Sequence, residues 1–145
     1  MTNDEVKQWL NRARGIDKEI SALLDARDIA LARCLSITTH PQKAKVQGYQ
    51  DQRGDAARIK YLTLEEKLDR LVDALCDVKS EILDVVGRVG DGTLRTLLIE
   101  RYINLKTWER VAVDMGYSWK QMHRLHGKAL GVVKDDIEGH TLSVL

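Results

Sequence analysis

Two long heptad patterns constrain the fold of this chain more than any other feature. In each of them, apolar residues recur at alternating steps of three and four, which places them along one stripe of a helix. The first run comprises Val6, Trp9, Ala13, Ile16, Ile20, Leu23, Ala30 and Cys34. The second comprises Ala57, Tyr61, Leu64, Leu68, Leu71, Leu75, Val78, Ile82 and Val85. Each run predicts a helix that packs lengthwise on a partner, over about residues 5–35 and 55–86.

The segment between these runs predicts a connector. It extends from Ser36 to Gly54, is polar, and contains Pro41 and Gly48. Two helices of similar length joined by such a segment favour an antiparallel hairpin. Residues 1–87 are therefore expected to form an antiparallel coiled-coil hairpin, with Asp4 capping its first helix.

The composition agrees with an all-α fold. The chain has one proline and no phenylalanine, and it is rich in straight-chain helix formers. Cys34 and Cys76 form no CxxC motif, which predicts reduced thiols in a cytoplasm rather than a disulfide framework. The first eight residues are polar and acidic, and no apolar stretch approaches the roughly 20 residues of a membrane span. We therefore expect a cytoplasmic protein without a signal peptide or a membrane segment.

Further apolar residues flank both heptad seams. They are Leu10, Leu24, Leu31, Val72 and Val86. The apolar stripe is thus wider than two helices in contact require. Either the C-terminal part folds back onto the hairpin or two chains pair into a four-helix bundle, and we expect a homodimer formed through the hairpin.

Gly87, Gly90 and Gly92 mark the predicted boundary between two domains. Three glycines within six residues form a hinge or a tight turn. Beyond them, three short helices are expected over about residues 93–103, 107–115 and 119–133, with Asp91 and Thr107 as caps of the first two. Residues 88–145 are therefore expected to form a small helix-turn-helix domain that ends in a short C-terminal tail.

The residue types around the second and third of these helices fit a helix-turn-helix. Ala112 is small enough for two steeply crossing helices to approach closely, and Gly116 supplies the positive φ that the turn needs. Ser118 and Gln121 have the spacing of a capping box for the last helix. The apolar face of that helix is predicted to consist of Met122, Leu125 and Ala129.

The opposite face of the last helix is the candidate DNA-contacting surface. From Ser118 to Leu130 there are three basic residues and no acidic ones, and Arg88 to Leu130 carries eight basic against four acidic residues. Arg124 and Lys120 are the best candidates for base edges or phosphates, since guanidinium fits guanine bidentately. Trp119 could stack on a base or pack at the helix start. The predicted DNA-binding residues are Ser118, Trp119, Lys120, Gln121, His123, Arg124 and Lys128.

Five motifs between Leu98 and Leu130 carry a family resemblance. They are Arg101-Tyr102-Ile103, Trp108-Glu109, Val111-Ala112, Met115-Gly116-Tyr117-Ser118 and the stretch Gln121 through Leu130. This part of the chain resembles region 4 of bacterial sigma-70-type factors, and more narrowly the small phage and prophage proteins described as sigma-region-4-like or late-gene transcriptional regulators. The resemblance implies promoter-type DNA contact by the helix that begins at Trp119, in a bacterial host cell, with RNA polymerase as a candidate partner.

One departure from the family limits the expected activity. A complete sigma factor opens the promoter with a cluster of exposed aromatic residues, whereas residues 1–87 contain only Trp9, Tyr49 and Tyr61, spread along the chain. The leading expectation is therefore a DNA-binding regulator without autonomous sigma activity. Two alternatives stay open: a packaging protein resembling a small terminase subunit, although its usual domain order is the reverse, and a coiled-coil interaction module that binds no DNA.

No catalytic, cofactor or metal site is expected. His123 and His126 lie three residues apart, but no carboxylate or thiol is near them in the sequence to complete a metal site. The chain has no P-loop, no GxGxxG and no GxSxG motif. We therefore do not expect an enzyme.

Overall fold

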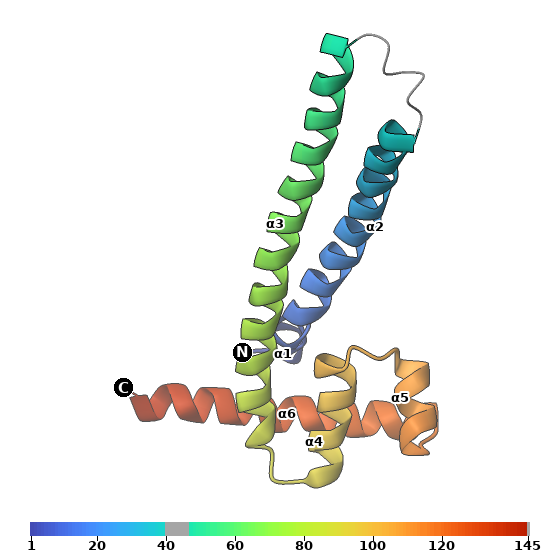
Figure 1. Ribbon diagram of the computed structural model, residues 1–145. Helices are drawn as coiled ribbons and strands as arrows, with labels where there is room; N and C mark the ends of the chain where they lie inside the picture. The colour runs from blue at the N-terminus through green and yellow to red at the C-terminus, as the bar shows by residue number, and fades with distance from the viewer. Residues whose placement is uncertain (40–46, 145) are drawn as a thin grey trace. The chain divides into compact units, whose positions relative to one another are not determined.

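The computed structural model describes the backbone of residues 1–39 and 47–144 and the side chains of residues 1–36 and 54–139. All regular structure in these residues is helical, which confirms the all-α class. The elements are α1 (Asn3–Leu10), α2 (Arg12–Thr39), α3 (Gln47–Gly87), α4 (Gly92–Leu98), the π-helix η2 (Ile99–Ile103), α5 (Trp108–Met115) and α6 (Trp119–Val144) (Figure 1). Within the described residues, none of the helices has the combination of length and apolar character that crossing a membrane requires.

Both long helices extend further into the predicted connector than expected. The helix α2 continues to Thr39 instead of ending near residue 35, and α3 begins at Gln47 instead of residue 55. Gly48 and Gly54 therefore lie inside a helix rather than in a connector. A glycine in a helix interior costs about 1 kcal/mol relative to alanine, and it does not end a helix whose neighbouring residues continue the pattern. Pro41 and the rest of residues 40–46 lie outside the described residues.

The first predicted helix is interrupted at Asn11. The N-cap of α1 is Thr2 rather than Asp4: the Glu5 amide donates to Thr2 Oγ1 at 3.2 Å, and the Thr2 amide donates to Glu5 Oε2 at 2.8 Å. Asn11 ends α1, and α2 starts at the next residue. Asn11 keeps helical φ and ψ angles, and its amide donates to the Lys7 carbonyl at 2.8 Å, so the interruption is local.

The chain divides into two compact units that differ from the predicted division at residues 87 and 88. Unit 1 contains Met1–Gly15 and Leu75–Leu145, and unit 2 contains Ile16–Ala74. The units differ from the prediction because the start of the first heptad run and the end of the second are buried together. Val6 and Leu10 of α1 pack in one cluster with the last turns of α3 and with the C-terminal helices.

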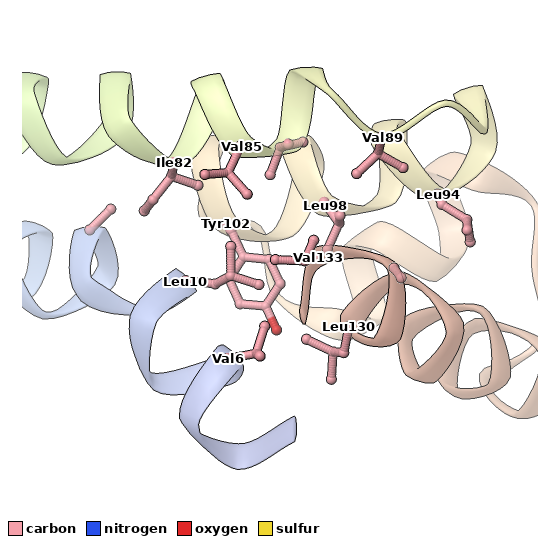
Figure 2. Packing of buried hydrophobic residues seen from close by; sticks show 13 residues of the cluster. Val6, Leu10, Ile82, Val85, Val89, Leu94, Leu98, Tyr102, Leu130 and Val133 are labelled. Atoms are coloured by element: carbon pink, nitrogen blue, oxygen red, sulfur yellow. The ribbon is translucent and has the colours of Figure 1, made fainter. Parts of the chain in front are cut away.

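The core of unit 1 is shared by five helices, α1, the start of α2, the end of α3, α4 and α6, and by the π-helix η2 (Figure 2). Figure 2 shows Val6 and Leu10 of α1 on one side of Tyr102, with Leu130 and Val133 of α6 on the other. Val89 is only 2% exposed. The glycine-rich segment is thus a tight turn anchored in the core, and Arg95 Nη1 holds it by donating to the Val89 carbonyl at 2.8 Å. The fully buried side chains of this cluster include Val6, Leu10, Ile82, Val86, Leu98, Tyr102, Leu130 and Val133.

The helix α6 does not end near Val133, and the predicted tail is helical as far as Val144. Ile137 packs against the core of unit 1. Asp136 pairs with Arg88 at 2.9 Å, and Glu138 lies 3.3 Å from the amino group of Met1. These contacts with Arg88, just after α3, and with the N-terminus stabilise the extra turns of α6, which the sequence of the tail alone does not indicate.

In unit 2, α2 and α3 run side by side in opposite directions (Figure 1). Arg27, which breaks the apolar pattern of the first heptad run, pairs with Glu65 across this contact at 3.2 Å. Among residues 16–36 and 54–74, the buried side chains are those of Ile20 and Leu68. Unit 2 therefore buries far less apolar surface than unit 1.

Candidate nucleic-acid interface

The helices α5 and α6 are joined by a turn whose backbone requires glycine. Thr107 caps α5 by accepting from the Arg110 amide at 3.2 Å, as predicted. Gly116 ends α5 with φ 70° and ψ 30°, in the left-handed region that favours a residue without Cβ. The Tyr117 amide donates to the Ala112 carbonyl at 3.0 Å and closes the turn.

A capping box fixes the start of α6. The Gln121 amide donates to Ser118 Oγ at 3.2 Å, and the Ser118 amide donates to Gln121 Oε1 at 3.0 Å. This confirms the predicted box and sets the first residue of α6 at Trp119. Ser118 and Gln121 thus have a structural role at this helix end, in addition to the DNA contact predicted for them.

A small second cluster holds α6 against the rest of the module. Its buried members are Leu97, Val111 and Met122, each 0% exposed. Of the predicted apolar face, Met122 and Ala129 are buried, and Leu125 is half-buried against both clusters. The orientation of α6 about its axis is therefore fixed by packing, and its other face is turned to solvent.

All seven predicted DNA-binding residues are exposed. Trp119 is 50% exposed and its ring lies 4.6 Å from that of His123, edge to face. The side chain of Trp119 is thus available at the surface while also contacting its own helix. The exposed residues are Ser118, Trp119, Lys120, Gln121, His123, Arg124 and Lys128.

The eight basic residues from Arg88 to Lys128 fall into two groups that differ in their partners. Those between residues 88 and 110 are engaged, because they bind carboxylates or backbone carbonyls: Arg88, Arg95, Arg101, Lys106 and Arg110. In contrast, the side chains of Lys120, Arg124 and Lys128 make no hydrogen bond or ion pair with any described residue. At steps of four residues, these three lie along one side of α6. Their charge is thus not neutralised within the described part of the chain.

A buried histidine under this face was not foreseen as a core residue. His126 is 5% exposed, and its Nε2 lies 2.6 Å from the hydroxyl of Tyr102. The ring of Trp108 packs edge-on against it at 4.4 Å. Burial lowers the pKa of His126 to about 4, with smaller contributions from Lys7, His123 and Arg101 in the same direction, and burial raises the pKa of Tyr102 to about 12. Both groups are therefore neutral at pH 7.

Two arginines hold the loop that precedes α5. Arg14 Nη2 donates to the carbonyls of Arg101 at 3.2 Å and Lys106 at 3.1 Å, and Arg101 Nη1 donates to the same Lys106 carbonyl at 2.8 Å. Leu105 adopts a left-handed φ of 59° between them. The guanidinium of Arg101 also stacks on Trp108, 4.6 Å from its ring centre. Arg14 lies more than 80 residues away in sequence, so only the burial of the N-terminal segment in unit 1 could have indicated its role.

Within the described side chains, no three histidine, cysteine or acidic groups are gathered as they would be around a metal ion. Neither Cys34 nor Cys76 forms a disulfide. Comparisons with protein-family models, curated proteins and solved structures find no match to this chain.

Proposed function

We propose that this protein binds double-stranded DNA through the outward face of α6, as a phage or prophage transcriptional regulator resembling sigma region 4. The observation that carries the proposal is the set of unpaired cations Lys120, Arg124 and Lys128 on a face without acids. Cationic side chains without a partner in the protein can neutralise DNA phosphates. The counterions that are condensed on the DNA are then released, which favours binding. If α5 and α6 act as a helix-turn-helix, α6 is the recognition helix, and its outward face enters the major groove of the DNA.

In the proposed complex, the residues of α6 have different roles. Arg124 lies near the middle of the cationic stripe, where its guanidinium can donate to O6 and N7 of a guanine. Lys120 and Lys128, one turn before and after it, contact phosphates. His123 and Trp119 form an exposed aromatic pair that lines the same face. Ser118 and Gln121 keep the helix end in place through the capping box.

The aromatic residues of the N-terminal part support a regulator rather than a complete sigma factor. Trp9 packs against the core of unit 1, and the guanidinium of Arg12 covers its ring at 4.7 Å. A side chain held in this way is not available to separate DNA strands. We therefore propose an accessory role in which RNA polymerase, if it takes part, supplies the promoter-opening activity.

Arg124→Ala is expected to weaken specific DNA binding by about 1–3 kcal/mol, because it removes a bidentate base contact. The affinity is measured by fluorescence anisotropy on a duplex selected from fragmented host and phage genomic DNA. Arg110→Ala is the matched control, since Arg110 is an exposed arginine of the same module that pairs with Asp114. Equal affinities for wild type and Arg124→Ala, with unchanged circular dichroism, would contradict the proposal.

The genomic selection itself separates the competing functions. Fragments enriched just upstream of transcription starts support the regulator, and an increase on adding RNA polymerase shows joint recognition. Fragments enriched only at a packaging site support a protein that resembles a small terminase subunit. No enrichment with or without polymerase contradicts DNA binding and leaves the interaction module as the remaining function.

Gly127→Ala is expected to separate stability from binding. Gly127 lies within α6 on the exposed face, and a Cβ there would meet no atom within 4 Å. Replacing it should stabilise unit 1 by about 0.5–1 kcal/mol, because alanine loses less backbone entropy than glycine in a helix. The same methyl group projects toward the proposed DNA, so the affinity for the selected duplex should fall. Urea titration and anisotropy on the same preparation test both effects, and a destabilised variant would contradict the first.

A further inference from the structure

Lys7 of α1 is a cation of unit 1 that lies outside the helix-turn-helix. Its side chain is 46% exposed, and within the described part of the chain it pairs only with Asp4, at 4.0 Å. The Asp4 side chain is itself 88% exposed. A solvated pair at this distance contributes little to stability, so the ammonium group of Lys7 can exchange it for an anion of a partner.

The packing of α1 fixes its orientation about its own axis. Val6 faces the core that α1 shares with α6 (Figure 2). The guanidinium of Arg12 covers the ring of Trp9 and pairs with Glu81 of α3 at 2.9 Å. The side of the helix that carries Trp9 therefore faces α3. At about 100° per residue, Lys7 lies on the other side of Val6, and it is thus turned away from α3.

The side of α1 that carries Lys7 faces the loop before α5 and the first turns of α6. Arg14 follows Lys7 by about two helical turns, on the same side, and the backbone stays helical between them. Arg14 donates to the Lys106 carbonyl of that loop at 3.1 Å. Burial is the main cause of the low pKa of His126, and the positive charges of Lys7 and His123 act in the same direction. Both cations therefore lie near this imidazole of α6.

The start of α1 lies along the same flank of α6. The amino group of Met1 pairs with Glu138 at 3.3 Å. At about 100° per residue, Glu138 lies between His123 and Arg124 around the helix. This sector of α6 separates its buried face from its cationic stripe. Consequently α1 borders the outward face of α6 along several turns.

The sector between α1 and the cationic stripe is open. Gly127 and Gly131 fall within it, and neither has a side chain to fill it. A Cβ at either position would meet no atom within 4 Å. A molecule that lies on the outward face of α6 can thus approach Lys7 without displacing a side chain of these two residues.

We propose that the ammonium group of Lys7 contacts a DNA phosphate beside the groove that α6 enters, which makes α1 part of the DNA-binding surface. This inference rests on the function proposed for α6. A major groove about 12 Å wide has a phosphate backbone along each edge, and packed helices lie about 8–10 Å apart. A helix that flanks the recognition helix is therefore placed over one of these backbones. A lysine there adds affinity and fixes the orientation without reading sequence.

The contact is tested by the salt dependence of DNA binding by the full chain. Lys7→Gln is expected to weaken binding severalfold, by the same factor on the selected duplex and on unrelated duplexes. It should also reduce the slope of log K against log salt by about 0.9. Raising the salt from about 50 to 200 mM then costs the variant roughly 3.5-fold less affinity than it costs wild type. The control is Lys67→Gln, which removes the same charge from an exposed position of unit 2.

The outcomes separate this contact from the function on which it rests. If Arg124→Ala weakens binding while Lys7→Gln behaves like Lys67→Gln, the role of Lys7 is wrong and the function of α6 stands. A loss confined to the selected duplex also contradicts a phosphate contact. A wild type that binds no duplex overturns both proposals. The melting temperature of Lys7→Gln should equal that of wild type, since only a solvated ion pair is removed.

A tethered cleavage reagent locates Lys7 without relying on affinity. In a Cys34→Ser/Cys76→Ser background, Lys7→Cys is labelled with an iron–EDTA chelate that cuts nearby DNA backbone. Cuts are expected on the strand that borders the groove contacted by Arg124, at one edge of the selected site. Lys67→Cys, labelled in the same way, is the control. Absent or scattered cuts from Lys7→Cys, or the same cuts from Lys67→Cys, would overturn the placement of α1 beside the DNA.

Discussion

Leu10→Ala is expected to lower the free energy of unfolding by about 2–5 kcal/mol, which is the usual cost of removing a fully buried leucine side chain. Leu10 is 0% exposed and packs in the core of unit 1. The effect is large because α6, α4 and the end of α3 all contribute to that core, so the cavity has no flexible wall to close it. The measurement is urea unfolding followed by circular dichroism at 222 nm.

The control for this prediction is Leu24→Ala. Leu24 also flanks the first heptad run, but it lies in unit 2 and is 36% exposed. Its replacement should cost less than about 1 kcal/mol in the monomer, because little apolar surface is removed from the interior. Similar losses for the two variants would contradict the division of the chain into units, since a simple hairpin predicts similar roles for both leucines.

Acidification from pH 7 to pH 4 is expected to remove up to about 3 kcal/mol of stability through His126 alone. The folded protein keeps His126 neutral because burial lowers its pKa to about 4. In the unfolded chain the same imidazole has its ordinary pKa near 6.5. Between about pH 6.5 and pH 4, the unfolded state therefore binds a proton at His126 that the folded state does not bind. The contribution is fully present above about pH 6.5 and is lost as the pH falls toward 4.

The matched variant is His126→Gln, whose amide can still accept a hydrogen bond from Tyr102 and does not titrate. Other groups, such as Glu100 and Asp114, whose hydrogen bonds to Lys106 lower their pKa values, also titrate in acid. Their contribution cancels when the two proteins are compared at each pH. The difference in unfolding free energy between wild type and variant should shrink or change sign between pH 7 and pH 4. A difference that stays constant would show that His126 is not protected from protonation.

The heptad spacing was sufficient to predict the helices but not the units they form. Ala13 and Ile20 belong to one stripe in the sequence, yet one packs in unit 1 and the other in unit 2. Apolar residues at alternating steps of three and four indicate that one face of a helix is buried. They do not indicate which element covers that face. Gly48 and Gly54 were also misleading, because a glycine lowers helix stability without deciding where the helix ends.

In the candidate interface, the turn and the helix caps could be predicted from residues that are near each other in the sequence. Gly116, Thr107 and the Ser118–Gln121 box were predicted because each depends on residues within three or four positions. The roles of His126 and Arg14 depend on contacts with distant residues, Tyr102 and Lys106, and no local pattern marks them. A lone histidine three residues from an exposed one is compatible with either face of a helix.

The assembly of unit 1 from the two ends of the chain has a consequence for protein synthesis. Val6 leaves the ribosome long before Leu130, and at roughly 5–20 residues per second the interval between them is roughly 6 to 25 s. During that interval the apolar face of α1 lacks the partners that bury it in the finished core. Contacts between residues so far apart also raise the contact order and slow folding relative to a simple hairpin. A nascent chain of this sequence should thus depend on shielding by chaperones until α6 has emerged.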